Sequence, residues 1–480
     1  MNTRAGLQTV VVVGGGLTAL CAAIAFARAL PRATVTMVAT PPDPVALADR
    51  LPAVGADGMA LFATLGVAER TLVANGAATH RVGERFAWGG TPFAIGEGEG
   101  VPTIAGAALH QLWLAHGDGA FDALVPGAAL AMADRFVVPP EDPGALVSGI
   151  DYALRLDAER ATPVFVQAAR AAKVRMVAAT TVGVDRTDAG VAAVLCGGER
   201  LTADLFVDAS GPGALLAAPN AAWVDWRTAL PADRLLLGIA AGRPSPTDRY
   251  EAVPDGWTAR WPLATRTLAA LAYASNVTSD ARARRAFGGE AERIVIAPRR
   301  QATPFAGNVL ALGDAAAAVG PLGWMGFPLA LAQIALALEL MPARDSEPLL
   351  RDEYNRRAIL RADRVRAYGA AFYLTGERRG AFWHPLRKAA MPPELATALA
   401  QFGQRGTLPP LEEEQVPRAR WRQALIGLGV RPARRDPVAL SVPTASAVAG
   451  LAQLRAAVAA LPGQLPPYPD YLMTMMREQR

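Results

Sequence analysis

Three short turns combine glycine with small or acidic residues directly after apolar segments, a setting that suits a phosphate-bearing ligand. The first follows the valines at 10–13 and sets Gly14, Gly16 and Ala19 at the spacing G-x-G-x-x-G/A. Gly14 allows a tight turn, Gly16 leaves room for a pyrophosphate, and Ala19 lets the next helix pack on the strand. That helix offers free N–H groups to an anion. The pattern predicts nucleotide binding, and a glycine turn without a ligand is the alternative.

The other two turns contain an aspartate. Asp208 and Gly211 lie in DASG, and Gly313 and Asp314 lie in GDAA. Three such turns in this order are typical of a split FAD-binding Rossmann domain, where the last carboxylate faces the ribityl hydroxyls and the next helix points at the flavin ring. Burying Asp314 is costly without a hydrogen-bond donor. The alternatives are that Asp314 caps the following helix, and that Asp208 caps a helix or ties its own turn.

The spacing of apolar residues and of glycine and proline predicts the elements that hold these turns. Besides the valine strand and its helix up to residue 30, we expect strands at 33–38, 79–88, 174–184, 201–206, 235–241, 268–275 and 308–312, a hairpin at 190–200, and helices at 45–67, 109–114, 149–173 and 327–340. The region 91–143 is expected to be looser, and the chain beyond 346 to be helical.

The fold class expected from this order is α/β: a split FAD-binding Rossmann domain with an inserted β-rich substrate domain and a helical C-terminal region. We assign the FAD-binding parts to 1–90, 151–216 and 301–345, the inserted segment to 91–150, the β-rich substrate part to 217–300, and the helical region to 346–480.

Composition excludes several other classes of protein. The chain has 480 residues, 52% of them hydrophobic, and a net charge of +5, which predicts a large core and gives no reason to expect nucleic acid. Cys21 and Cys196 are expected to be buried thiols in a reducing compartment, and the four histidines lack metal-ligand spacing. The apolar stretch at 309–341 is broken by Asp314 and two prolines, so we expect no membrane span and a cytoplasmic protein.

These motifs together resemble the flavin-dependent tryptophan halogenase family, a branch of the flavoprotein monooxygenases, almost from end to end. The resemblance rests on GGGLTALCAA at 14–23, LFVDASGPGALL at 205–216, LPADRLL at 230–236, GWTARWPLATRT at 256–267, FAGNVLALGDAA at 305–316 and WRQALIGLGVRP at 421–432. It implies FAD as the cofactor, a small aromatic or indole-like substrate, and a flavin reductase as the supplier of reduced flavin.

The sequence departs from the family pattern at the positions that matter for halogenation. Arg81 stands where the motif T-F-K-x-G-x-x-F has its catalytic lysine, and a guanidinium is a poor nucleophile. The family's E-P-L-E-S-T turn is replaced by GPLGWMG at 320–326, without either glutamate. Ala39 replaces the acid that binds the ribose, and the nearest acid is Asp43. The family's flavin loop has no convincing match at 48–54.

The resemblance nevertheless suggests roles for several residues. Arg81 is a candidate donor beside a flavin hydroperoxide or a substrate carboxylate, and pairing with an acid such as Glu84 is the alternative. His80 has the pKa of a general acid or base, although strand alternation turns it to the opposite face from Arg81. The remaining candidates are the substrate-stacking tryptophans Trp257, Trp261 and Trp324, whose alternative role is core packing, and Gly326, which with Gly323 leaves room for flavin or for a tight turn.

Two hypotheses therefore remain open. The first is a flavin-dependent, halogenase-like oxidoreductase or monooxygenase that passes an oxygen or halogen equivalent to an aromatic or indole-like small molecule without the standard halogenase residues. The second is a non-catalytic paralogue whose FAD binding is weakened or lost and which acts through a protein partner, either an active homologue or a second copy of itself.

Overall fold

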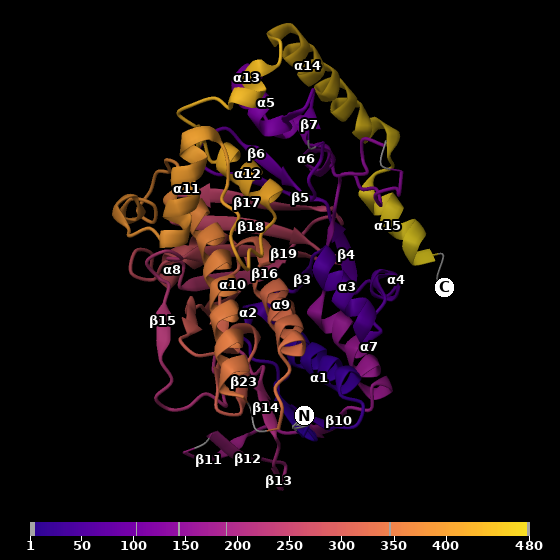
Figure 1. Ribbon diagram of the computed structural model, residues 1–480, viewed down its shortest axis with the longest axis vertical. Helices are drawn as coiled ribbons and strands as arrows, with labels where there is room; N and C mark the ends of the chain where they lie inside the picture. The colour runs from indigo at the N-terminus through magenta and orange to yellow at the C-terminus, as the bar shows by residue number, and fades with distance from the viewer. Residues whose placement is uncertain (1–4, 102, 143–144, 189, 345–346, 478–480) are drawn as a thin grey trace. The chain divides into compact units, whose positions relative to one another are not determined.

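The computed structural model describes residues 5–101, 103–142, 145–188, 190–344 and 347–477 (Figure 1). The chain divides into two compact units. Unit 1 comprises Met1–Ala78, Leu156–Leu230 and Ile294–Arg366, and unit 2 comprises Thr79–Arg155, Pro231–Arg293 and Ala367–Arg480. Each unit is therefore assembled from three separate stretches of the chain.

Unit 1 is built on a six-stranded sheet in the order β10-β2-β1-β14-β23-β22. Its first five strands are parallel and only β22 runs antiparallel. The strands are β1 (Thr9–Val13), β2 (Thr34–Ala39), β10 (Arg175–Ala178), β14 (Leu205–Asp208), β22 (Phe305–Ala306) and β23 (Val309–Ala311). All four valines of β1 are at least 97% buried, as a central strand covered on both faces requires.

The parallel order explains why three distant turns meet. Because β1, β14 and β23 are neighbours and point the same way, the turns that follow them lie at one edge of the sheet. Helix α1 (Leu17–Ala29) starts there, is buried from Leu17 to Phe26, and packs against α7 (Ala158–Ala171) and α9 (Gly326–Glu339).

The other elements of unit 1 are short. They are α2 (Leu47–Arg50), β3 (Ala53–Val54), α3 (Ala56–Leu65), α4 (Glu69–Ala74), β11 (Gly183–Thr187), β12 (Gly190–Cys196), β13 (Glu199–Leu201), β15 (Trp223–Asp225), β21 (Arg299–Gln301), η2 (Gly313–Ala315), β24 (Ala317–Ala318) and η3 (Leu322–Trp324). Four elements cross the unit boundaries: β4 (Ala78–Arg81), β9 (Ala153–Leu156), β20 (Glu292–Val295) and α10 (Pro348–Leu374).

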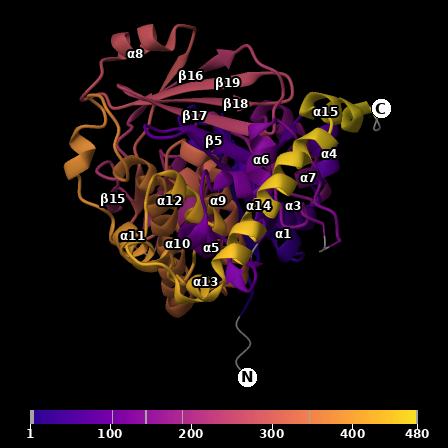
Figure 2. The same ribbon diagram turned by 90° about the horizontal axis from the view of Figure 1, so that it is seen from above.

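Unit 2 contains a mostly antiparallel sheet in the order β20-β16-β19-β18-β17-β5-β6. Figure 2 shows its central strands side by side. The strands are β5 (Gly83–Ala87), β6 (Phe93–Gly96), β16 (Arg234–Ala240), β17 (Thr247–Val253), β18 (Gly256–Pro262) and β19 (Thr267–Tyr273), besides β20. The β5–β17 pair is an exception, because these two strands run parallel.

Short strands and helices complete unit 2. They are β7 (Thr103–Ile104), β8 (Ala107–Ala108), α5 (Leu109–His116), η1 (Asp122–Leu124), α6 (Pro126–Met132), α8 (Asp280–Phe287), η4 (Pro385–Lys388), α11 (Pro393–Arg405), α12 (Arg418–Gly427), α13 (Pro437–Ser441), α14 (Thr444–Ala460), η5 (Leu461–Gln464) and α15 (Tyr468–Arg477).

The α/β fold class expected from the sequence is confirmed, and five of the expected elements are wrong. The strand at 79–88 is two strands, β4 and β5, which belong to different sheets, and the strand at 201–206 covers the end of β13, a loop and the start of β14. The helix at 45–67 is interrupted, because Pro52 lacks an N–H donor and Gly55 ends a short strand before α3 starts. The helix at 149–173 is β9 followed by α7. The strand at 174–184 is two strands, β10 and β11, which belong to different sheets.

Two described segments have the length and apolar composition of a membrane span. They are Leu322–Glu339, of which 67% is buried, and Thr444–Gln464, of which 28% is buried. The first is η3 with α9, a helix that packs against α1, α2 and α3 within unit 1. A buried core helix satisfies the same criteria of length and hydropathy as a membrane span.

The glycine turn after β1 yields a first prediction. A Cβ at Gly14 would lie 2.2 Å from the Ala209 carbonyl oxygen, at the end of the neighbouring strand. We therefore expect Gly14→Ala to lower the free energy of unfolding by about 2 kcal/mol or more, since the backbone must shift. Urea unfolding measures this. Gly213→Ala, with no atom within 4 Å of its Cβ, is the control, and equal losses in both variants would contradict the prediction.

Candidate functional site

The first turn is packed tightly by the protein itself. The Gly14 amide donates to the Val38 carbonyl at 3.1 Å, which ties the turn to β2. A Cβ at Gly15 would lie 2.1 Å from the Thr40 carbonyl oxygen. Glycine is therefore required at 14 and 15 by contacts with the chain's own backbone, before any ligand is considered.

The donors at the N-terminus of α1 already have an acceptor, the carboxyl group of Asp49. One carboxylate oxygen of Asp49 accepts from the Thr18 backbone amide and from the Thr18 hydroxyl, both at 2.7 Å. The other oxygen lies 2.0 Å from where a Cβ on Gly16 would stand. Asp49 therefore fills the space that the missing side chain of Gly16 leaves open, and it satisfies a donor at the start of the helix.

The carboxylate of the third turn lies close to Asp49. Asp314 is 5% exposed and accepts from the Ala48 amide at 2.8 Å, so it caps α2 rather than the helix that follows it. Burial, together with the carboxylates of Asp49 and Asp43, raises the pKa of Asp314 to about 7. Burial and Asp43 likewise raise the pKa of Asp49. The three aspartates form an acidic cluster beside the α1 N-terminus.

The second turn is held together by its own carboxylate. Asp208 accepts from the Ser210 hydroxyl at 2.6 Å and from the Leu216 amide at 2.7 Å, so both of its oxygens are used within the loop. Gly211 has φ +86°, and a Cβ there would lie 2.9 Å from an Asp43 carboxylate oxygen. The turn thus brings Gly211 against the acidic cluster, while Asp208 has a structural role.

The predicted site residues near α9 pack against the protein. Gly323 and Trp324 both adopt positive φ, +71° and +57°, and Trp324 is 1% exposed. A Cβ at Gly326 would lie 3.2 Å from the Ala48 backbone, so the close approach made here is that of α2.

Unit 2 places Arg81 in a network of buried charges. Its guanidinium lies 2.9 Å from Glu97, 3.4 Å from Asp248 and 3.5 Å from Glu84. The Arg81 side chain is 7% exposed, and those of Glu84 and Asp248 are almost fully buried. Three carboxylates therefore surround Arg81, the position at which the sequence resemblance led us to expect a lysine.

Two further arginines balance the charge of this network. Arg420 pairs with Glu84 and, at 2.6 Å, with Glu97. Arg155 pairs with Asp248 at 2.7 Å and also donates to the Ser245 carbonyl. Three arginines and three carboxylates thus leave no net charge, which is the condition under which buried ions are tolerated.

The network keeps Arg81 protonated. Burial alone would lower the pKa of Arg81, but Glu97 and Glu84 outweigh it and raise that pKa. Burial alone would raise the pKa of Glu97, but Arg420 and Arg81 lower it. A guanidinium held charged by three carboxylates cannot act as a nucleophile, since that role needs a free neutral nitrogen.

His80 lies in different surroundings from Arg81. Its backbone amide donates to the Tyr468 hydroxyl at 2.8 Å, and Nδ1 lies 3.1 Å from the same oxygen. The ring stacks on Phe136 with centroids 4.3 Å apart, and the residue is 1% exposed. The structure therefore encloses the His80 ring in an aromatic cluster, while the His80 carbonyl accepts from Arg155 of the ionic network at 2.9 Å.

The two tryptophans of β18 are completely buried. Trp257 donates from Nε1 to the Tyr373 hydroxyl at 2.9 Å, and Trp261 donates to the Tyr250 hydroxyl at 3.1 Å. Both indoles thus have their polar group satisfied within unit 2, as core tryptophans require.

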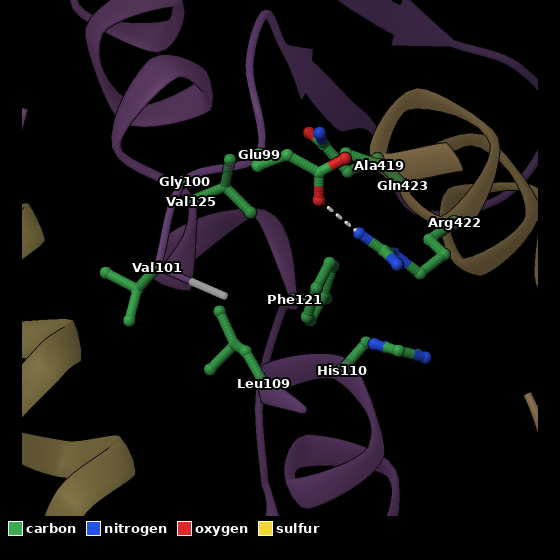
Figure 3. Close-up of a pocket in the computed structure, with 10 residues that line it drawn as sticks. All are labelled: Glu99, Gly100, Val101, Leu109, His110, Phe121, Val125, Ala419, Arg422 and Gln423. Carbon is green, nitrogen blue, oxygen red and sulfur yellow. Dashed lines mark hydrogen bonds and ion pairs between the residues drawn. The ribbon is translucent and has the colours of Figure 1, made fainter. Parts of the chain in front are cut away.

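Three hollows formed by described residues lie away from the predicted site residues. The cavity in Figure 3 has a volume of about 20 Å³ and is spanned by the Glu99–Arg422 ion pair of 2.6 Å. Burial lowers the pKa of His110, which lines it, to about 4. This is room for a water molecule. Two hollows of about 600 and 430 Å³, one in each unit, are lined by none of the predicted site residues.

Among the described residues, no three histidine, cysteine or acidic side chains gather as metal ligands. Both cysteines are buried free thiols.

Sequence reasoning did not identify Asp49 or the partners of Arg81 other than Glu84. Asp49 lies in the stretch 48–54, where the sequence has no convincing match to the family's flavin loop. That missing match was the one sign in the sequence that this stretch differs from the family pattern. Glu97, Asp248, Arg155 and Arg420 come from four distant parts of the chain, and no local pattern connects them.

The comparisons with known proteins agree with this architecture. The tryptophan halogenase family model matches residues 9–444. BrvH, a flavin-dependent halogenase from Brevundimonas sp. BAL3, is 26% identical, with a TM-score of 0.90 over 98% of this chain and 99% of its own. Xcc4156, a flavin-dependent halogenase from Xanthomonas campestris, is 24% identical, with a TM-score of 0.89 over 98% of each chain. The curated proteins contain no match.

The chain therefore belongs to the tryptophan halogenase family, as the motifs in the sequence predicted. Family membership implies FAD as the cofactor. The glycine turn and the parallel sheet suit a dinucleotide, but the α1 N-terminus does not, because Asp49 occupies it and two more carboxylates lie beside it. With Asp49 in this position, the residues do not fit the FAD diphosphate.

The raised pKa of Asp314 predicts a pH-dependent effect on stability. The folded protein favours the neutral carboxyl of Asp314, whereas the unfolded chain ionises it at its ordinary pKa. The free energy of unfolding is therefore highest at low pH and falls as the pH rises through the range up to about 7. Asp314→Asn keeps an acceptor for the Ala48 amide and cannot ionise. We expect it to match the wild type near pH 4 and to be about 2–4 kcal/mol more stable at pH 8.

Urea unfolding at pH 4, 6 and 8 measures this difference. Asp57→Asn, at an exposed aspartate of α3, is the control and should show no such pH trend. A constant difference between Asp314→Asn and the wild type at all three pH values would contradict the prediction.

The ionic network of unit 2 predicts a large loss on removing one charge. Arg81→Met leaves three carboxylates with two arginines, so we expect a loss of about 3–5 kcal/mol in the free energy of unfolding. Arg249→Met breaks an exposed pair, Arg249–Asp134, whose side chains are 48% and 36% exposed, and should cost less than about 1 kcal/mol. Equal losses in the two variants would show that the network is not energetically distinct.

Proposed function

We propose that this chain is a halogenase-family protein that does not halogenate, and that it acts by binding rather than by catalysis. The observation that carries the proposal is the position of Arg81, which is held in a neutral network by Glu84, Glu97 and Asp248. In place of a lysine amine, the chain has a permanently charged guanidinium that is committed to three carboxylates.

Two other features support a non-catalytic role. The tryptophans considered for substrate stacking, Trp257 and Trp261, are core residues with satisfied indole groups. The two hollows of about 600 and 430 Å³, both formed by described residues, are not lined by the candidate catalytic residues Arg81 and His80. We propose a cytoplasmic protein whose partner is a protein, either an active homologue or a second copy of this chain.

A specific observation favours a second candidate function. The three turns of a split FAD-binding domain meet at one sheet edge, and Asp314 is retained there. This arrangement suits a flavin-dependent oxidoreductase that takes reduced flavin from a reductase and acts on a small aromatic substrate without a catalytic lysine. It requires a change at the α1 N-terminus before the cofactor can bind.

A halogenation assay tests the proposal. We expect the purified protein, supplied with reduced FAD, oxygen, bromide or chloride, and an indole, to form no halogenated product by mass spectrometry. The flavin-dependent halogenase from Brevundimonas is the positive control. Arg81→Lys should also be inactive, because the introduced ammonium would be paired by the same carboxylates.

Two results would overturn the proposal. Halogenated product from the wild type that disappears in Arg81→Met, with the fold retained by circular dichroism, would assign catalysis to Arg81. An oxygenated product that forms without halide would establish the oxidoreductase instead.

A further inference from the structure

We propose that the Asp49 carboxylate is an internal ligand of the α1 N-terminus and competes directly with the diphosphate of FAD, so that the cofactor binds only when Asp49 has left. The inference concerns binding alone and holds whether or not chemistry follows. It therefore goes beyond the proposed function.

The hydrogen bonds show the competition. In a G-x-G-x-x-G/A turn the pyrophosphate approaches over the second glycine and is bound by amides at the start of the helix. Here the Thr18 amide and hydroxyl both donate to Asp49 at 2.7 Å. A carboxylate and a phosphate oxygen accept the same donors, so one excludes the other.

Asp49 occupies the space that the diphosphate would need, as well as its hydrogen-bond donors. A single methyl group on Gly16 would approach the Asp49 carboxylate to 2.0 Å. The room above Gly16, which a dinucleotide needs, is therefore taken by atoms of this chain. The backbone is also close at Gly15, where a Cβ would lie 2.1 Å from the Thr40 carbonyl oxygen.

The neighbouring charges oppose an incoming anion. The charged groups that act on Asp49 and on its neighbour Asp314 are themselves carboxylates, Asp43 among them. A diphosphate brought to this helix end would add negative charge to the cluster. The Asp49 carboxyl already accepts from the donors at this helix end, where the partial positive charge of the helix would otherwise attract the diphosphate.

Asp49 can leave without unfolding the sheet. It is half-buried and lies on α2, a helix of four residues that follows the prolines at 41, 42 and 44. Among the hydrogen bonds described, only those from Thr18 hold the Asp49 carboxylate. The pairing of β1 with β14 does not involve Asp49.

The test compares FAD binding to the full-length wild type with that to three variants. Asp49→Gly removes the carboxylate, Asp49→Asn removes only its charge, and Asp57→Asn removes an exposed carboxylate of α3 as a control. Equilibrium dialysis with oxidised FAD measures the dissociation constants, and circular dichroism checks the fold. Inorganic pyrophosphate, followed by its competition with FAD, probes the helix end itself.

We expect Asp49→Gly to bind FAD at least about tenfold more tightly than the wild type, which corresponds to about 1.4 kcal/mol. Asp49→Asn should lie between them and Asp57→Asn should match the wild type. Pyrophosphate should compete with FAD in Asp49→Gly. If Asp49→Gly does not fold, the order of Asp49→Asn and the wild type decides. Equal dissociation constants for the wild type and the Asp49 variants would overturn the inference.

The outcome is separable from that of the proposed function. Tighter FAD binding by Asp49→Gly without halogenated product supports both. Tighter binding with halogenated product supports the inference and overturns the non-catalytic proposal. Unchanged binding with no product overturns the inference alone.

Discussion

Every donor left unpaired at the end of a strand or the start of a helix must find an acceptor, and in unit 1 carboxylates meet that requirement. The parallel sheet brings the turns after β1, β14 and β23 to one edge, where backbone amides point outward. Asp49 accepts from Thr18, Asp314 from Ala48, and Asp208 from its own loop. At the sheet edge where a dinucleotide fold binds its ligand, these backbone donors are thus paired with the chain's own carboxyl groups.

In unit 2 the main constraint is that buried charges must be paired. Arg81 could be buried only with carboxylates, and these in turn required Arg155 and Arg420. Such a network stabilises one arrangement of the strands that carry it. A guanidinium with three anionic partners has little tendency to release a proton, and this supports our proposal that Arg81 is not catalytic.

Much of the fold was predictable because it depends on local pattern. The valine run, the glycine spacing and the apolar segments before DASG and GDAA predicted β1, α1, β14 and β23 and the family itself. The helix predicted at 45–67 failed because its apolar periodicity continued across Pro52 and Gly55. That failure hid the short α2, and with it Asp49, the residue on which our inference about cofactor binding rests.

The sequence by itself determined the class of fold and the family, because glycine spacing and strand-forming runs act through the backbone over a few residues. It also placed Arg81 where the resemblance led us to expect a lysine. Only the tertiary structure decided where Arg81 and Asp49 find their partners, since Asp49 meets Thr18 across 31 positions and Arg81 meets Asp248 across 167. Hydrogen bonds and ion pairs between distant segments depend on how the chain packs, and no local pattern carries that information.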